Sequence, residues 1–220
     1  MQLSIFDVLG PEMIGPSSSH TAGAVKLARI AATIAAMPFK KVSFGLSGSF
    51  AKTGKGHGTH NALIAGILGM KENDERIVNA NQIAREKEIE IEFYEEDIEW
   101  IHENAVHIKF YHVNGEVTHI YGASIGGGRI KISQINSFKT NVLADAPTLI
   151  FFHKDIPGMI SEITRVLAEN NINIATMQVA REEKGKLANT TVELDESISP
   201  TLTHCFSDLE KIDKVIFIDV

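Results

Sequence analysis

The order of strand and helix signals in the last third of the chain restricts its fold more than any other feature. Runs rich in β-branched and aromatic residues alternate there with amphipathic segments of helical length. On the first helical segment Ile160, Ile163, Val166 and Leu167 share one face. In chain order the expected elements are a strand at 148–153, a helix at 158–170, strands at 173–180 and 186–194, a helix at 200–209 and a strand at 215–220. This βαββαβ order predicts a ferredoxin-like fold.

The sequence changes character just upstream of that block, near Ala144-Asp145-Ala146-Pro147. The part before it contains two segments rich in small residues and several long amphipathic stretches. A chain of 220 residues can form one large domain or two modest ones. We therefore expect an α+β protein, with an N-terminal α/β domain at 1–145 and the βαββαβ domain at 146–220.

The first domain is expected to mix helices and strands. An alanine-rich helix at 22–36 follows three serines, any of which could cap it, and Pro38 ends it. Asn114-Gly115 predicts a two-residue hairpin turn. The other expected elements are strands at 41–46, 89–94, 105–113, 116–122 and 129–135, and helices at 61–70 and 74–88.

The charge balance argues against two classes of partner. The chain has 21 basic and 28 acidic residues, a formal net charge of −7. Nucleic-acid affinity depends on clustered lysine and arginine, and anionic lipid attracts the same residues. We therefore expect neither a general nucleic-acid binder nor a protein that docks on anionic membranes.

Cysteine content and apolar runs bear on the compartment. Cys205 is the only cysteine, so this chain alone can build no intrachain disulfide and no all-cysteine zinc or iron–sulfur site. Residues 1–7 lack the basic region and apolar run of a signal peptide. The most apolar stretch, 27–37, contains Arg29 and is too short to span a bilayer. We expect a soluble cytoplasmic protein in a reducing compartment.

One serine-rich loop has more polar residues than a helix cap requires. The segment Gly15-Pro16-Ser17-Ser18-Ser19-His20-Thr21 directly precedes the first expected helix. Backbone amides and the helix dipole at such a position favour an anion, and His20 could supply a proton or a charge. The alternative is a plain capped helix with serines that face solvent.

Two further loops are rich in glycine. In Gly54-Lys55-Gly56-His57-Gly58-Thr59-His60 the backbone can approach a ligand, and a histidine between two glycines is hard to explain by packing. This loop lacks the Gly-Lys-Ser/Thr order of a P-loop. Ser124-Ile125-Gly126-Gly127-Gly128 could form an anion-binding nest of amides. The alternatives are a flexible surface loop for the second loop and a strand break or bulge for the third.

The other candidate ligands are interpreted as structural. His107 alternates with the apolar Val106 and Ile108, which places it on a polar face opposite the core. Cys205 is expected to be a small buried hydrophobe. Four histidines without the tight spacing of metal ligands surround the expected hairpin: His102, His107, His112 and His119.

Together the three loops resemble a known family. Residues 6–23 (FDVLGPEMIGPSSSHTAG), 48–59 (GSFAKTGKGHGT) and 124–128 (SIGGG) are similar, in order, to signature segments of the iron–sulfur-dependent bacterial L-serine dehydratase β chain. The second domain resembles an ACT domain, with Asp155-Ile156-Pro157-Gly158 after its first strand and Asn173-Ile174 opening its second.

The resemblance implies a two-part enzyme that converts L-serine to pyruvate and ammonia without pyridoxal phosphate. In this family a partner α chain holds a [4Fe-4S] cluster through cysteines, and iron acts as a Lewis acid while a base removes the α-proton. His20 and His57 would be the catalytic residues of this chain. His60 stands where the family usually has aspartate, which leaves its role open. The substrate-binding residues implied are Ser17, Ser18, Ser19, Thr21, Gly58, Thr59, Ser124, Gly126 and Gly127.

The ACT resemblance implies a regulatory amino-acid site, with L-serine as the expected effector, and a homo-oligomer joined through this domain. The residues implied are Asp155, Pro157, Gly158 and Asn173, and family members often have asparagine near Asp155. The alternatives are a purely structural dimerisation domain and a chain that senses serine without catalysis. A phosphate or nucleotide binder is disfavoured because no intact phosphate fingerprint follows a strand.

Overall fold

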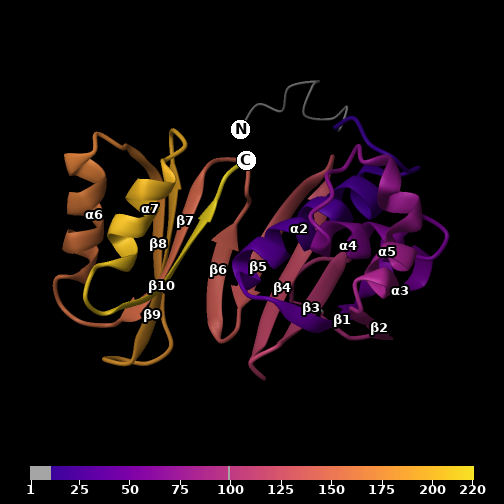
Figure 1. Ribbon diagram of the computed structural model, residues 1–220, viewed down its shortest axis with the longest axis horizontal. Coiled ribbons are helices and arrows are strands. Elements are labelled where there is room, and N and C mark those ends of the chain that lie inside the picture. The colour runs from indigo at the N-terminus through magenta and orange to yellow at the C-terminus, as the bar shows by residue number, and fades with distance from the viewer. Residues whose placement is uncertain (1–10, 99) are drawn as a thin grey trace. The chain divides into compact units, whose positions relative to one another are not determined.

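The computed structural model describes residues 11–98 and 100–220, which form two compact units divided between Asn136 and Ser137 (Figure 1). Both units combine helices with a sheet, which confirms the α+β class. The division falls upstream of the expected boundary at 145/146 because strand β6 (Phe138–Val142) contacts strands of the second unit. Residues 6–10 of the first signature segment lie outside the described residues.

The sheet of the first unit has the strand order β2-β1-β3-β4-β5. β1 is parallel to β2, and the other neighbours are antiparallel. The expected hairpin joins β3 to β4 through Asn114-Gly115, with Gly115 at φ 92°. The strands are β1 (Phe39–Leu46), β2 (Glu90–Glu95), β3 (Ala105–His112), β4 (Val117–Gly126) and β5 (Arg129–Ile135).

Helices cover one face of this sheet, with α2 against β4 and β5 and α4 against α2 (Figure 1). Leu27 of α2 is fully buried against Gly122 of β4, where a side chain would collide with it. A methyl group on Gly66 of α4 would collide with the Val25 carbonyl, so this glycine permits close helix contact. Each large apolar side chain buried here contributes about 1.5–3 kcal/mol. The helices are α2 (Gly23–Ala35), α3 (Gly48–Thr53), α4 (Thr59–Ile67) and α5 (Ala80–Glu86).

Three local differences from the expected elements matter for the site. A π-helical turn, Ser18–Ala22, precedes α2. The short helix α3 was not predicted. β4 continues to Gly126, so part of the third loop is strand. Farther along, the expected helix at 74–88 is a 3-10 turn, Glu75–Asn79, followed by α5.

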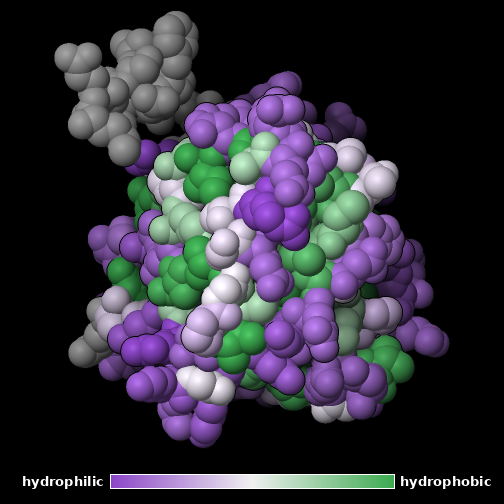
Figure 2. Space-filling model, turned by 90° about the vertical axis from the view of Figure 1, so that its left-hand side faces the viewer, coloured by the Kyte–Doolittle hydropathy of each residue, from purple (hydrophilic) through white to green (hydrophobic). Residues whose placement is uncertain are grey.

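The second unit has the antiparallel strand order β10-β7-β9-β8, which confirms the ferredoxin-like prediction. Phe151, Ile163, Val192 and Phe206 belong to its core. Seen from the side of α6, its hydrophobic residues are interspersed with hydrophilic ones (Figure 2). The elements are β7 (Thr148–Lys154), α6 (Met159–Glu169), β8 (Ile174–Arg181), β9 (Leu187–Leu194), α7 (Pro200–Ser207) and β10 (Ile212–Ile218). Among the described residues, no helix has the length and apolar character needed to cross a membrane.

Candidate active site

The first loop leads into the π-helical turn and fixes the start of α2. Ser17 caps this turn, because its Oγ accepts a hydrogen bond from the His20 amide at 3.1 Å. A serine therefore caps the turn that precedes α2, whereas α2 itself begins after Ala22 without a side-chain cap. π-helical turns often occur at functional sites. Here the turn holds His20 in its middle and buries Thr21 at its end.

His20 lies beside two hydroxyl groups of α3. Its Nε2 is 3.1 Å from Ser49 Oγ and 3.1 Å from Thr53 Oγ1, and its ring meets the edge of Phe50. Ser49 and Thr53 are four residues apart, so they lie on the same face of that helix. Desolvation by burial lowers the pKa of His20, with a smaller contribution in the same direction from His57. The ring is therefore neutral at neutral pH.

His57 lies next to His20, with ring centroids 4.9 Å apart. Its Nδ1 is 3.0 Å from the backbone carbonyl of Thr53. Because a carbonyl oxygen only accepts, Nδ1 carries the proton and Nε2 has the free lone pair. Thr21 Oγ1 donates to the His57 carbonyl at 3.1 Å, which ties the first loop to the second. The His57 side chain itself is exposed.

The third loop also reaches the first. Ser124 is fully buried, and a methyl group on Gly23 at the start of α2 would collide with its Oγ. A Cβ on Gly128 would lie 2.7 Å from the Pro11 ring. Both contacts need glycine where the loops meet. The three loops identified in the sequence thus converge at the start of α2.

The expected nest of amides is instead the end of a hairpin. Gly126 pairs with Arg129, and Gly127-Gly128 forms the tight turn between β4 and β5. All three glycines have positive φ, at 98°, 61° and 76°. The alternative of a strand break or bulge therefore describes this segment, since the β4–β5 register shifts between Ser124 and Gly126. The substrate contacts of Gly126 and Gly127 stay predictions.

Four other predicted binding residues have no described contact with the two histidines. Ser18 and Ser19 are half-buried, and Gly58 adopts φ 72° just before α4. Thr59 is fully buried, and its Oγ1 has no hydrogen-bond partner among the described residues. Their binding roles stay predictions. His60 stacks on the Phe93 ring at 4.0 Å, and burial lowers its pKa.

Ser49 and Thr53 are site residues that the sequence reasoning missed. The spacing of their hydroxyls at i and i+4 is a detectable signal only if the segment is known to be a helix. The six residues Gly48–Thr53 show no apolar periodicity that would predict one. The structure therefore adds α3 to the site.

One expectation about another residue was wrong, and one holds only in part. His107 lies on the sheet face away from α2, as expected, but it is only 2% exposed because Tyr121 and Glu96 cover it. His107 Nδ1 bonds to Glu96 Oε2 at 2.9 Å, and its Nε2 is 3.0 Å from His119 Nδ1. Cys205 is exposed on α7 rather than buried. The exposure of a side chain depends on how segments distant in sequence pack against it. The alternation of polar and apolar residues along one strand does not predict that packing.

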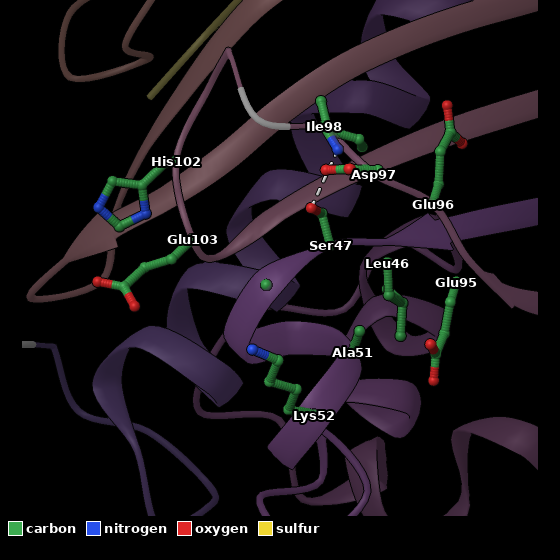
Figure 3. A pocket seen from close by; sticks show the side chains of 11 residues that line it. Leu46, Ser47, Ala51, Lys52, Glu95, Glu96, Asp97, Ile98, His102 and Glu103 are labelled. Atoms are coloured by element: carbon green, nitrogen blue, oxygen red, sulfur yellow. Dashed lines mark hydrogen bonds between the residues drawn. The ribbon is translucent and has the colours of Figure 1, made fainter.

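A cavity of about 600 Å³ lies beside a different face of α3 (Figure 3). None of the predicted site residues lines it. Ser47 accepts a hydrogen bond from the Ile98 amide at its edge. Its charged and ionisable lining residues are Lys52, Glu95, Glu96, Asp97, His102 and Glu103. It is therefore a separate feature from the histidine pair.

In the part of the chain that the structure describes, no group of three or more His, Cys, Asp or Glu residues could hold a metal ion. The single cysteine belongs to α7 in the second unit. The residues present thus do not fit the role of ligands to an iron–sulfur cluster.

The predicted effector residues of the second unit have partners of their own. Asp155 accepts hydrogen bonds from the Gly185 amide at 2.9 Å and from Arg181, and the first of these chiefly lowers its pKa. Asn173 Nδ2 donates to Asp195 Oδ2 at 2.6 Å. Gly158 adopts φ 96° with open space where a side chain would be. A ligand would therefore compete with bonds already made.

Two family models match this chain. Residues 4–134 match the family model of the serine dehydratase beta chain, and residues 147–210 match the ACT domain. A probable L-serine dehydratase, beta chain, of Bacillus subtilis is 41% identical over 97% of this chain and 95% of its own length.

A second and a third relative extend this comparison. The L-serine dehydratase, beta chain, of Peptoniphilus asaccharolyticus is 35% identical over 99% of this chain and 98% of its own length. A D-3-phosphoglycerate dehydrogenase of Bacillus subtilis is 29% identical over 83% of this chain but only 35% of its own length. The matched segments include all three convergent loops, and the chain belongs to the serine dehydratase β chain family, with a C-terminal ACT domain.

Proposed function

We propose that this chain is the β subunit of an L-serine dehydratase, which converts L-serine to pyruvate and ammonia together with an α chain. The observation that carries the proposal is the His20–His57 pair at the point where the three loops meet. The names of the two β-chain relatives support the same activity. The proposal assigns the [4Fe-4S] cluster to the α chain, and no pyridoxal phosphate takes part.

His57 is the general base in this proposal. Its Nδ1–H is held by the Thr53 carbonyl, so the lone pair on Nε2 is free to accept the α-proton of the substrate. Its exposed side chain is accessible to a substrate. Loss of the α-proton and the β-hydroxyl group leaves 2-aminoacrylate, whose hydrolysis gives pyruvate and ammonia. No step on this chain requires it to bind iron.

The hydroxyl groups of Ser18 and Ser19 supply the substrate-binding contacts. Ser18 and Ser19 lie in the same π-helical turn as His20, half-buried and without a described side-chain partner. Hydroxyl donors of this kind suit the carboxylate of serine. The neutral His20 ring orients the substrate beside His57. Substrate affinity is therefore assigned to the turn and proton transfer to the second loop.

The test is reconstitution with an α chain under anaerobic conditions, with pyruvate and ammonia measured from L-serine. We expect equal amounts of both products from the complex and none from this chain alone, because a single cysteine cannot hold a cluster and the described residues include no group of three or more metal-binding side chains. Activity of this chain alone would contradict the division of roles. A complex with a complete cluster but no turnover of L-serine would contradict the proposed reaction.

A regulatory role for the second unit is a second candidate, favoured by its match to the ACT domain. L-serine is the proposed effector, bound near Asp155 and Gly158. Calorimetry of the full chain with L-serine and with other amino acids tests this, with Asp155→Ala as the variant. Binding of L-serine that weakens in the variant supports it. Absence of heat with every amino acid leaves only a dimerisation role, which light scattering can measure.

A further inference from the structure

We propose that Thr53 is a positioning residue that sets the protonation of both histidines, through its hydroxyl for His20 and its carbonyl for His57. This inference rests on the proposed function for its catalytic consequence. Thr53 is the last residue of α3, so its carbonyl has no partner within the helix. One residue at a helix end thereby contacts both rings of the pair.

The hydroxyl contacts decide where the His20 proton lies. Thr53 Oγ1 is 2.9 Å from the Ser49 carbonyl, which can only accept, so the single hydroxyl hydrogen points there. The lone pairs of the same oxygen face His20 Nε2 at 3.1 Å. Nε2 must therefore donate. In the opposite tautomer two lone pairs would meet at that distance.

Ser49 follows the same assignment. Its Oγ is 3.1 Å from His20 Nε2 and 3.3 Å from Thr53 Oγ1, so it can accept from the ring and donate to the threonine. The neutral His20 ring then has its lone pair on Nδ1. Burial, which lowers the pKa of His20, keeps the ring in this neutral form.

The carbonyl contact gives His57 the opposite tautomer. The Thr53 carbonyl accepts from His57 Nδ1 at 3.0 Å and from the Gly56 amide at 3.1 Å, which uses both of its lone pairs. His57 thus has its lone pair on Nε2. The two neighbouring rings are held in complementary states, and the base is ready without prior proton rearrangement.

The proposal predicts different effects for the side-chain hydroxyl and the backbone carbonyl of Thr53. Thr53→Val removes the hydroxyl but keeps the shape and the carbonyl, whereas Thr53→Ser keeps both groups. Thr33→Val is the matched control, because Thr33 Oγ1 makes the same helical bond to a carbonyl four residues back, at 3.1 Å, and has no described contact with a histidine. The control therefore reports the cost of losing that bond alone.

The decisive measurement is the histidine tautomer in the full chain, read at pH 8 from long-range ¹H–¹⁵N spectra. His20→Gln and His57→Gln assign the two rings by loss of their signals. We expect Nε2–H for His20 and Nδ1–H for His57 in the wild type, in Thr53→Ser and in Thr33→Val. In Thr53→Val the His20 ring should become mixed or Nδ1–H, while His57 is unchanged. An unchanged His20 tautomer in Thr53→Val would overturn the proposal.

Activity of the complex with an α chain tests the catalytic consequence separately. Thr53→Val should lower kcat/KM about 10- to 100-fold, because the His20 ring that orients the substrate changes its tautomer, and Thr53→Ser should restore most of it. Equal kcat/KM in Thr53→Val and the wild type would overturn the positioning role. Predicted tautomers in a complex that does not turn over L-serine would instead contradict the proposed function, so the two failures can be told apart.

Discussion

The first unit contains two histidine pairs, and their surroundings differ in a way that separates chemistry from structure. His20 lies in the π-helical turn and His57 in the second loop, with hydroxyl and backbone partners, and the His57 side chain is exposed. His107 and His119 lie on adjacent strands, and the first is buried against the Glu96 carboxylate. A histidine whose two ring nitrogens both take part in a buried series of hydrogen bonds stabilises the fold, whereas one with a free, exposed nitrogen can exchange protons.

The strand pair sits on the sheet face away from α2. Gly122 contacts Leu27 of that helix, so its neighbour Tyr121 points to the opposite face, where it stacks on His107 at 3.8 Å. Desolvation lowers the pKa of His107 to about 4, against the opposing hydrogen bond to Glu96. The ring is therefore neutral in the fold at any pH well above 4.

The largest expected effect separates the two pairs by activity. In the complex with an α chain, His57→Ala should lower kcat roughly 100-fold or more, because it removes the proposed base. His119→Gln should leave kcat within about twofold, since His119 has no role in the reaction. Steady-state kinetics of pyruvate formation measure both. Loss of kcat in His119→Gln with an unchanged fold would erase the distinction between the pairs.

Stability should show the reverse order. Glu96→Ala leaves the buried His107 N–H and the Tyr94 hydroxyl without their acceptor, which costs about 1–3 kcal/mol of unfolding free energy. The control Glu116→Ala changes an exposed carboxylate on a hairpin and should stay within about 0.5 kcal/mol. Urea denaturation measures both. Equal stability of the two variants would show that the hydrogen bonds of Glu96 do not stabilise the fold.

The convergence of the loops can be tested at Gly23. Gly23→Ala should lower stability by about 1–3 kcal/mol, because the added methyl group collides with Ser124. Ser124→Gly in the same chain should recover part of that loss. Gly56→Ala is the control, since its methyl group would meet only the Thr53 carbonyl at 3.6 Å. Independent, additive effects of Gly23→Ala and Ser124→Gly would contradict the contact between the loops.

A pH dependence of stability belongs to the strand pair. The unfolded chain protonates His107 near its ordinary pKa of 6.5, while the folded chain does so only near 4. Stability is therefore lost as pH falls from about 6.5 to about 4, because protons bind the unfolded state first. His107→Gln should flatten this slope, and His102→Gln, an exposed control, should not. The same slope in the wild type and His107→Gln would contradict the assignment.

The regular elements and the three loops could be predicted from local sequence. The alanine-rich α2, the Asn114-Gly115 hairpin and the βαββαβ order of the second unit all depend on periodicity and turn chemistry, which are properties of neighbouring residues. The serine-rich cap and the two glycine loops were found for the same reason. Each is a short segment with more serine, glycine or histidine residues than a turn or a helix cap requires.

The contacts that complete the site could not be predicted in this way. Ser49 and Thr53 join His20 only after α3 forms, and that helix is too short to show a period. His107 alternates like a residue on an open face, yet Tyr121 from the next strand covers it. Both contacts depend on segments distant in sequence. Local periodicity and turn chemistry do not predict how such segments pack.

The central claim is that His57 removes the α-proton of L-serine. The most direct test compares pyruvate formation from L-serine and from L-serine deuterated at the α-carbon, in the wild-type complex and in His57→Ala. The account predicts a variant slowed roughly 100-fold or more, with a full primary isotope effect, because proton removal becomes rate-limiting. A variant with wild-type kcat, or a slow variant without an isotope effect, would contradict it.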